Sequence, residues 1–387
     1  MIRSFFFAAR LAWRQLIFDK PKLIAAIMGV MFACLLVFMQ LGFKDSLMTS
    51  AASAPIKMQA DVFLMHKQTE AMWRSEKFDR SLLMRALGHP DVASVHAMYM
   101  GLAAFKNIDT RLKRTLMVYG FDPESNLMNI PEVINEREKI KIKDQVFFDR
   151  ASRPEFGPVE SWIATGRAQT EINNYKVALS GTYLMGTSFA ADGNVITSEQ
   201  NFLRIFPHRS MSEIDLGFIR ARDPSRITQI KQDIEAMMGK EVMVLTYAEL
   251  IAYEQAYWQN SAPVGFIFGM GVIMGLIVGM VIVYQILFTE ISNNLSQFAT
   301  LKAMGYPQSY LVKVVFSSAM YLALLGFVPG FALSLYLYQL AEQNIFIPFP
   351  MPVSKIAFVF SLILGMCFVA GALAIRKLKS ADPADMF

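Results

Sequence analysis

The chain has 387 residues, of which 54% are hydrophobic and 18% are charged, and its formal net charge is +5. The excess of basic over acidic residues lies beside the long apolar runs and not in the polar domain, so nucleic acid is excluded as an expected partner. Both cysteines, Cys34 and Cys367, fall inside apolar runs, which excludes a disulfide framework in the polar part of the chain.

The basic segment 1–22 predicts an amphipathic helix. At about 100° per residue, Arg3, Arg10 and Arg14 share one narrow arc, while Trp13 faces elsewhere. We therefore expect this helix to lie in the cytoplasmic headgroup layer, with its arginines toward anionic lipid. The alternative is an ordinary basic flank of a first span.

Four uncharged apolar runs of about 20 to 28 residues are each long enough to cross a bilayer as a helix. The sequence Ala52-Ser53-Ala54 is similar to a signal-peptidase site, but the first run is longer than the roughly 7 to 15 residues of a secretory core, so an uncleaved anchor is expected. The absence of ionisable side chains from the runs disfavours an ion-coupled carrier. The predicted spans are 23–43, 261–288, 314–341 and 356–375.

Positive charge next to the spans predicts their orientation. The loop 289–313 carries Lys302 and Lys313 against Glu290, and the tail 376–387 carries three basic residues against two acidic ones. The positive-inside rule then places both termini and this loop in the cytoplasm of a multi-pass inner-membrane protein. The periplasmic parts are then the block 44–260 and the short loop 342–355.

The periplasmic block mixes helical and strand periodicities, so the expected fold class is a four-helix membrane protein with a large α+β domain between helices 1 and 2. Helices are expected at 80–87 and 225–238, because Gly88 and Gly239 provide stop signals. The middle region 144–193 is rich in Gly, Pro and polar residues and is expected to be loop-rich. Strands are expected at 61–65, 95–105, 115–120, 175–180, 216–221 and 242–246, the last two flanking a helix as in a βαβ-type unit.

A stalk helix is expected to enter the second span from about residue 246. If it continued to Met304 it would be about 90 Å long, enough to carry movement across the bilayer, and Pro263 is a potential kink. Gly271, Gly275 and Gly279 leave a flat face on this helix. This face either forms a subunit interface across a two-fold axis or packs against a helix of the same chain.

Catalytic and metal-binding motifs are missing from the sequence. The four histidines show no HExxH spacing, there is no GxSxG elbow, and Gly239-Lys240 lacks the remainder of a phosphate-binding loop. We therefore expect no catalytic residue, no metal and no bound cofactor on this chain.

Two groups of motifs resemble a known family. Residues 289–291 and 299–306 are similar to the E-I-x…L-K-A-x-G segment of MacB/FtsX-type ABC permeases, and the order of spans and domain is similar too. Residues 152–158, 186–194 and 201–206 resemble the DevC branch. The chain departs from that branch at Ala190, where glycine is expected, and in a less acidic 290–298 segment.

This resemblance implies the transmembrane subunit of an ATP-driven exporter that works by mechanotransmission. The implied partners are a second copy of the chain, a DevA- or MacB-type ATPase that holds ATP and Mg, a DevB-like periplasmic membrane fusion protein and a TolC-like outer-membrane duct. The implied efflux cargo is a lipid, a glycolipid or another hydrophobic compound, with membrane lipid as a further partner.

Residues 289–313 would form the cytoplasmic coupling segment that docks on the ATPase. Ile291, Leu295 and Phe298 recur at helical spacing, which predicts an exposed apolar stripe that needs a partner. The alternative is packing of this stripe against the third span. The expected coupling residues are Glu290, Ile291, Leu295, Phe298, Leu301, Lys302, Ala303, Met304, Gly305 and Tyr306.

Two other functions share this plan. One is a lipoprotein-releasing permease, which extracts lipid-anchored proteins. The other is an FtsX-like regulator that transports nothing and activates a cell-wall hydrolase.

Overall fold

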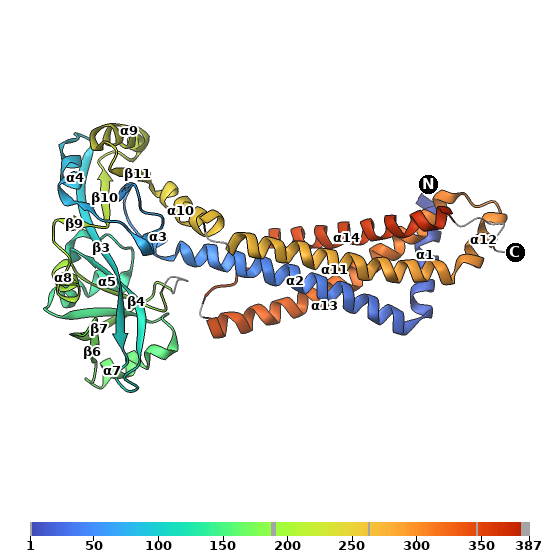
Figure 1. Cartoon of the computed structure of the whole chain (residues 1–387), viewed down its shortest axis with the longest axis horizontal. Coiled ribbons are helices and arrows are strands. Elements are labelled where there is room, and N and C mark those ends of the chain that lie inside the picture. Colours follow the sequence, from blue (N-terminus) through green and yellow to red (C-terminus); the bar gives the residue numbers. More distant parts are fainter. Residues whose placement is uncertain (1, 187–190, 262–263, 346, 381–387) are drawn as a thin grey trace. The chain divides into compact units, whose positions relative to one another are not determined.

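The computed structural model describes residues 2–186, 191–261, 264–345 and 347–380 (Figure 1). The chain divides into two compact units. The helical unit comprises residues 1–45, 264–341 and 349–387, and the sheet unit comprises residues 46–263 and 342–348.

Four helices of the described chain are long and apolar enough to cross a membrane. They are α2 (Lys20–Ala51), α11 (Val264–Asn293), α13 (Gln308–Ile345) and α14 (Val353–Ser380). α2, α13 and α14 each contain one predicted span and extend it, whereas α11 begins three residues after the start of the predicted span 261–288 and continues beyond its end. Two further helices belong to the same unit, α1 (Ile2–Phe18) and α12 (Leu295–Ala303).

Small residues allow α2 to pack closely on both α11 and α13. A Cβ atom added at Gly326 on α13 would lie 2.4 Å from the Cβ of Val30 on α2. One added at Gly29 on α2 would lie 2.4 Å from the Cγ2 of Ile282 on α11. Since neither glycine has room for a side chain, Val30 and Ile282 pack directly against the backbone of the neighbouring helix.

The amphipathic helix α1 packs on the bundle through every fourth residue. Ala8, Ala12 and Leu16 are buried in the core of the helical unit. The ring of Trp13 lies 5.1 Å from that of Tyr321 on α13, between centroids. α1 is thus part of the helical core as well as a basic flank.

The stalk helix does not continue to Met304, because α11 ends at Asn293. Helix α10 (Tyr247–Ala256) begins with a capping box between Thr246 and Glu249, and the chain then forms a π-helix over Tyr257–Ser261. Pro263, the potential kink, lies outside the described residues. α11 has 30 residues and so spans about 45 Å, half the length of the expected rod.

The sheet unit is built on a nine-stranded mixed sheet that curls back on itself. Its strand order is β11-β1-β10-β3-β4-β8-β5-β7-β6, and β6 pairs with β3 as well as with β7. Six strands therefore close into a ring, from which β10, β1 and β11 extend. The strands are β1 (Val62–His66), β3 (Val92–Lys106), β4 (Lys113–Phe121), β5 (Gln145–Asp149), β6 (Gln169–Ile172), β7 (Tyr175–Tyr183), β8 (Asn194–Ser198), β10 (Leu216–Ala221) and β11 (Val242–Thr246), with a separate pair β2 (Phe78–Asp79) and β9 (Glu213–Ile214).

The α+β prediction is confirmed, with two local differences. β10 and β11 are both antiparallel to β1, so they are parallel to each other and α9 (Ile227–Met238) connects them with β1 inserted between. The region 144–193 is not mainly loop, because it contains β5, β6, β7 and α7 (Val159–Ala164). The short helices are α3 (Ser53–Lys57), α4 (Arg80–Arg85), α5 (Pro131–Asn135), α6 (Arg137–Lys141) and α8 (Glu199–Ile205).

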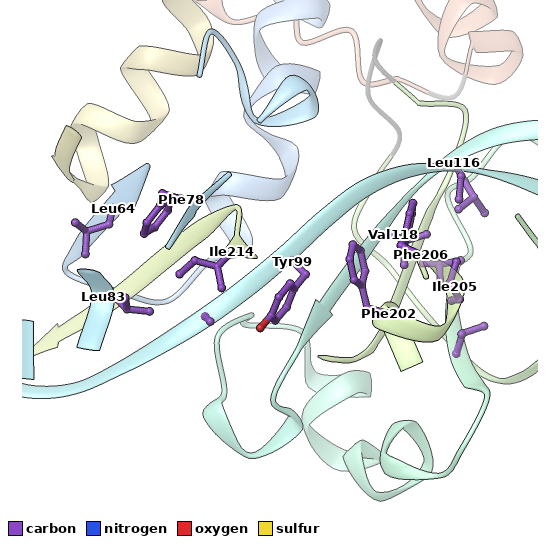
Figure 2. Close-up of a cluster of buried hydrophobic side chains, with 14 of the residues drawn as sticks. Leu64, Phe78, Leu83, Tyr99, Leu116, Val118, Phe202, Ile205, Phe206 and Ile214 are labelled. Atoms are coloured by element: carbon purple, nitrogen blue, oxygen red, sulfur yellow. The ribbon is translucent and has the colours of Figure 1, made fainter. Parts of the chain in front are cut away.

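One hydrophobic core of this unit combines aliphatic side chains with a group of aromatic rings (Figure 2). Phe202 on α8 lies 4.4 Å from Phe206 and 5.6 Å from Tyr99 on β3, between ring centroids. Gly120 on β4 makes room for α8, because a Cβ there would lie 2.4 Å from that of Phe202. A second core contains eight buried methionines, whose flexible side chains fill irregular space.

Candidate functional site

The coupling segment begins with a break between α11 and α12. The backbone N–H of Asn294 donates to the Glu290 carbonyl at 3.1 Å, and its side-chain Nδ2 donates to the same oxygen at 2.9 Å. Asn294 itself has φ −101° and ψ 15°, outside the helical region. The Asn294 side chain thus provides a donor for a carbonyl group at the end of α11, at the point where the chain begins α12.

The apolar stripe of this segment is buried, not exposed. Ile291 and Phe298 are 6% and 3% exposed and belong to the core of the helical unit. Leu295 is partly buried against the same core, which also contains Tyr310 and Leu311 of α13. The expectation of an exposed stripe is therefore wrong, and the alternative, packing against the third span, describes these three residues. Their periodicity marks the face by which the end of α11 and the following helix α12 pack on the spans.

The L-K-A-M-G-Y sequence ends α12 with a Schellman motif. The N–H of Gly305 donates to the Lys302 carbonyl at 3.0 Å, and that of Tyr306 donates to the Leu301 carbonyl at 3.1 Å. Gly305 has φ +88°, a conformation that disfavours any residue with a Cβ. The part of the sequence that resembles the family is thus a helix-terminating signal.

Several side chains around the end of α12 are exposed. Lys302, Ala303, Met304 and Tyr306 are exposed, and Met304 and Tyr306 are large apolar residues at 63% and 44% exposure. The Tyr306 ring lies 4.9 Å from that of the buried Tyr310, between centroids. These residues form the outer surface of the coupling segment, whereas Leu301 is partly buried.

The three glycines of α11 face helices of the same chain. A Cβ at Gly271 would lie 2.3 Å from Cδ of Gln40, and one at Gly275 would lie 3.2 Å from Cβ of Leu36. One at Gly279 would lie 2.5 Å from Cβ of Ala33 on α2 and 2.6 Å from Sδ of Met366 on α14. The geometry fits the intrachain alternative.

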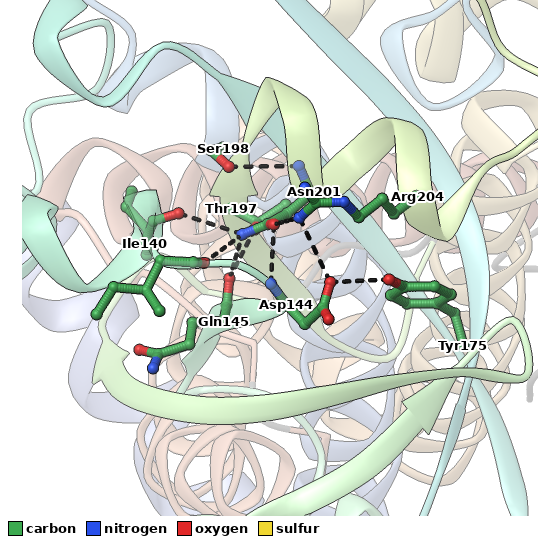
Figure 3. Close-up of polar contacts among 9 residues, drawn as sticks. Ile140, Asp144, Gln145, Tyr175, Thr197, Ser198, Asn201 and Arg204 are labelled. Atoms are coloured by element: carbon green, nitrogen blue, oxygen red, sulfur yellow. Dashed lines mark hydrogen bonds and ion pairs between the residues drawn. The ribbon is translucent and has the colours of Figure 1, made fainter.

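Residues of the DevC-like motifs organise the sheet unit around two buried side chains. The Asn201 amide donates to three carbonyl oxygens, including that of Gln145 at 3.1 Å, and accepts from the Asp144 N–H at 2.9 Å (Figure 3). The Asp149 carboxylate accepts from Asn194 Nδ2 at 3.0 Å and from the Gly186 N–H at 2.9 Å. The described residues of these motifs hold loops in place through buried hydrogen bonds. Residues 187–190 of the second motif, including Ala190, lie outside the described residues.

Helix α10 contains a buried carboxyl that no sequence pattern predicts. Glu254 is 3% exposed, and its Oε1 accepts from the Met72 N–H at 2.5 Å. Burial raises the pKa of this carboxyl to about 7. A cavity of about 30 Å³, room for one water molecule, adjoins Glu254 together with Met100, Met117 and Tyr119.

A polar cavity that the sequence did not predict lies between α1, the start of α2 and the end of α11. It has a volume of about 520 Å³, and Arg14, Gln15, Lys22 and Glu290 are among its lining residues. These residues are far apart in the sequence, so no local pattern brings them together. Within the described ranges no group of three or more His, Cys, Asp or Glu side chains could hold a metal ion.

The four apolar helices and the folded unit inserted between the first and the second define a multi-span membrane protein with a large domain outside its spans. Residues 269–383 match the family described as FtsX-like permease C-terminal. This part of the chain is therefore an FtsX-like permease domain, and the resemblance to MacB/FtsX-type ABC permeases is confirmed. Permeases of this kind are the transmembrane subunits of ABC systems and work with separate ATPases.

Two solved structures are similar to about half of the chain. The periplasmic region of MacB from Actinobacillus actinomycetemcomitans is 10% identical with a TM-score of 0.34, over 50% of this chain and 91% of that one. The extracellular domain of the noncanonic ABC-type transporter YknZ from Gram-positive bacteria is 9% identical with a TM-score of 0.33, over 48% of this chain and 99% of that one. Among curated proteins no relative matches this chain.

Proposed function

We propose that this chain is the transmembrane subunit of an ATP-driven exporter of the MacB/DevC type. The observation that carries the proposal is the FtsX-like permease match over residues 269–383, which includes the coupling segment. ATP and Mg would bind to a separate ATPase, and this chain would contribute no catalytic group.

The packing of α12 supports a role in force transmission. Ile291 and Phe298 anchor the segment in the core shared by α11 and α13, while Lys302, Met304 and Tyr306 remain on its surface. A partner that pushes on the exposed surface would therefore move both spans, because closely packed helices transmit displacement. The docking residues are thus the exposed ones, and the buried ones transmit the movement.

The remaining parts of the proposal extend from the family resemblance and the charge pattern. The termini and the coupling segment would be cytoplasmic, the sheet unit would lie outside the membrane, and two copies would act together. A DevB-like fusion protein and a TolC-like duct would complete the export path for a lipid, a glycolipid or another hydrophobic cargo.

Surface substitutions test the docking assignment. The double variant Met304→Asp with Tyr306→Asp should lose the ATPase that co-purifies with the tagged full chain from native membranes, together with its stimulated ATP hydrolysis. The matched control is Met211→Asp with Met237→Asp, because these methionines of the sheet unit are also exposed, at 44% and 36%. Undiminished ATPase recovery with the first double variant would refute docking at this surface.

An FtsX-like regulator of a cell-wall hydrolase is the second candidate, because the matched family carries that name. Recovery of a fusion protein and a duct with the purified chain would favour export. Recovery of a hydrolase without them would favour regulation.

A further inference from the structure

The cavity between α1, α2 and α11 contains acceptor oxygens that lack donors. Glu290 and Gln15 both line it, and three of their side-chain oxygens are buried with no hydrogen-bond partner in the described chain: Glu290 Oε1, Glu290 Oε2 and Gln15 Oε1. The Ser318 hydroxyl approaches the Glu290 carboxylate without reaching hydrogen-bond geometry. Buried acceptors without donors are costly, so this cavity favours a ligand that brings N–H groups.

Basic side chains line the same cavity. The Arg14 guanidinium on α1 is exposed and forms no ion pair with the described residues, whereas Lys22 on α2 lies 2.5 Å from Asp19. The formal charges of Arg14 and Lys22 balance those of Asp19 and Glu290. A ligand with one positive and one negative group fits this arrangement better than a simple anion or cation.

The position of the cavity indicates where such a ligand comes from. α1 and α12 lie at the same end of the helical unit (Figure 1), and Lys22 immediately precedes the apolar run of the first span. This is the level of lipid headgroups, where basic residues meet phosphate. Phe18, also in the lining, is 93% exposed and offers an apolar surface next to the polar groups.

We propose that this cavity binds the headgroup of a phospholipid that carries a primary ammonium, with the ammonium at Glu290 and Gln15 and the phosphate at Arg14. The three N–H donors of a primary ammonium match the three unpartnered oxygens. All three oxygens are buried beside the cavity, so binding would turn the Glu290 carboxylate and the Gln15 amide toward the ligand about their soft terminal torsions. The volume of about 520 Å³ accommodates a headgroup. Bound lipid would fasten α1 to the start of the coupling segment.

Two lipids that differ only in the amine provide the test. The purified full chain is mixed with phosphatidylethanolamine or phosphatidylcholine of identical acyl chains, and bound lipid is counted by native mass spectrometry. We expect about tenfold tighter binding of the ethanolamine lipid, because the trimethylated amine keeps its charge but has no N–H donor. Glu290→Gln should reduce this preference to less than about twofold.

The phosphate contact has its own matched pair of variants. Arg14→Gln should weaken both lipids alike, by about tenfold, while Arg10→Gln should leave both unchanged, because Arg10 is exposed on the same helix but does not line the cavity. Gln15→Leu provides a second probe of the ammonium site if Glu290→Gln fails to fold.

Equal binding of the two lipids to the wild-type chain would overturn the proposal. An ethanolamine preference that survives both Glu290→Gln and Gln15→Leu would overturn it as well. If Glu290→Gln changed ATPase recovery and not the lipid preference, the acceptors would instead bind a basic side chain of the partner protein.

Discussion

The ammonium of Lys355 on α14 lies 2.7 Å from the carboxylate of Asp45 on α2. Lys355 is buried, donates to the Pro350 carbonyl at 2.7 Å and lies 5.6 Å from the ring centre of Tyr338 on α13. One side chain therefore connects three of the four membrane helices.

Lys355 is more deeply buried than Asp45, so replacing one partner should cost more stability than replacing the other. The Lys355 side chain is 5% exposed, whereas that of Asp45 is 43% exposed. Asp45→Asn leaves a buried ammonium and should cost about 3 kcal/mol, whereas Lys355→Met leaves a carboxylate that water can reach and should cost about 1 kcal/mol. Thermal unfolding of the full chain in nanodiscs measures both, and the opposite ranking would contradict this account.

The positive φ of Gly305 predicts that no residue with a Cβ is tolerated without strain there. Gly305→Ala should destabilise the end of α12 by about 1 kcal/mol, although no atom lies within 4 Å of the added methyl group. Gly305→Asn should be milder, because asparagine adopts this conformation more readily. Hydrogen exchange at the Tyr306 amide reports the loss, and unchanged protection in Gly305→Ala would disprove the Schellman assignment.

Burial of Glu254 predicts that acid stabilises the sheet unit. Its pKa of about 7 in the folded chain is above its ordinary value of 4.5, so the folded state binds the proton more tightly. This tighter proton binding stabilises the folded state by at most about 3 kcal/mol. The stabilisation is present in full below pH 4.5 and is lost as pH rises through about 7. Glu254→Gln should reduce the pH dependence of the unfolding temperature of the full chain between pH 5 and 8. A slope equal to that of the wild type would exclude Glu254 as its source.

A second buried ion pair predicts a larger loss of stability. Arg209 Nη2 lies 2.7 Å from Asp215 Oδ2, with the two side chains 5% and 2% exposed. Asp215 also accepts from the Met100 N–H at 2.8 Å. Arg209→Met leaves the carboxylate buried without its cation and should cost about 3 to 5 kcal/mol, measured by denaturant unfolding of the full chain. The double variant with Asp215→Leu should recover part of that loss, and additive losses would refute the pairing.

Local patterns predicted the elements better than their assembly. Apolar runs predicted the four spans, and β-branched and aromatic composition predicted strands such as β10 and β11, because length and composition are local properties. The helical periodicity of Ile291 and Phe298 was interpreted as an exposed docking stripe, since a pattern cannot show which surface covers it. The proximity of Arg14 and Glu290 at one cavity was not predicted, because only the packing of α1 on α11 brings them together. The insertion of β1 between β10 and β11 likewise depends on pairing across about 150 residues of sequence.

The glycines of α11 allow the two alternatives for its flat face to be separated by experiment. Gly279→Leu places a side chain where a Cβ would already lie 2.5 Å from Ala33 and 2.6 Å from Met366. Overpacking between α2, α11 and α14 should lower the stability of each single chain by about 1 to 3 kcal/mol. Gly269→Leu is the matched control, because it changes the same helix where nothing lies within 4 Å of a Cβ. Thermal unfolding in detergent at several protein concentrations distinguishes the alternatives. Within-chain packing predicts a loss that does not depend on concentration, whereas loss of a subunit interface would lower stability in a concentration-dependent way and leave the isolated chain intact.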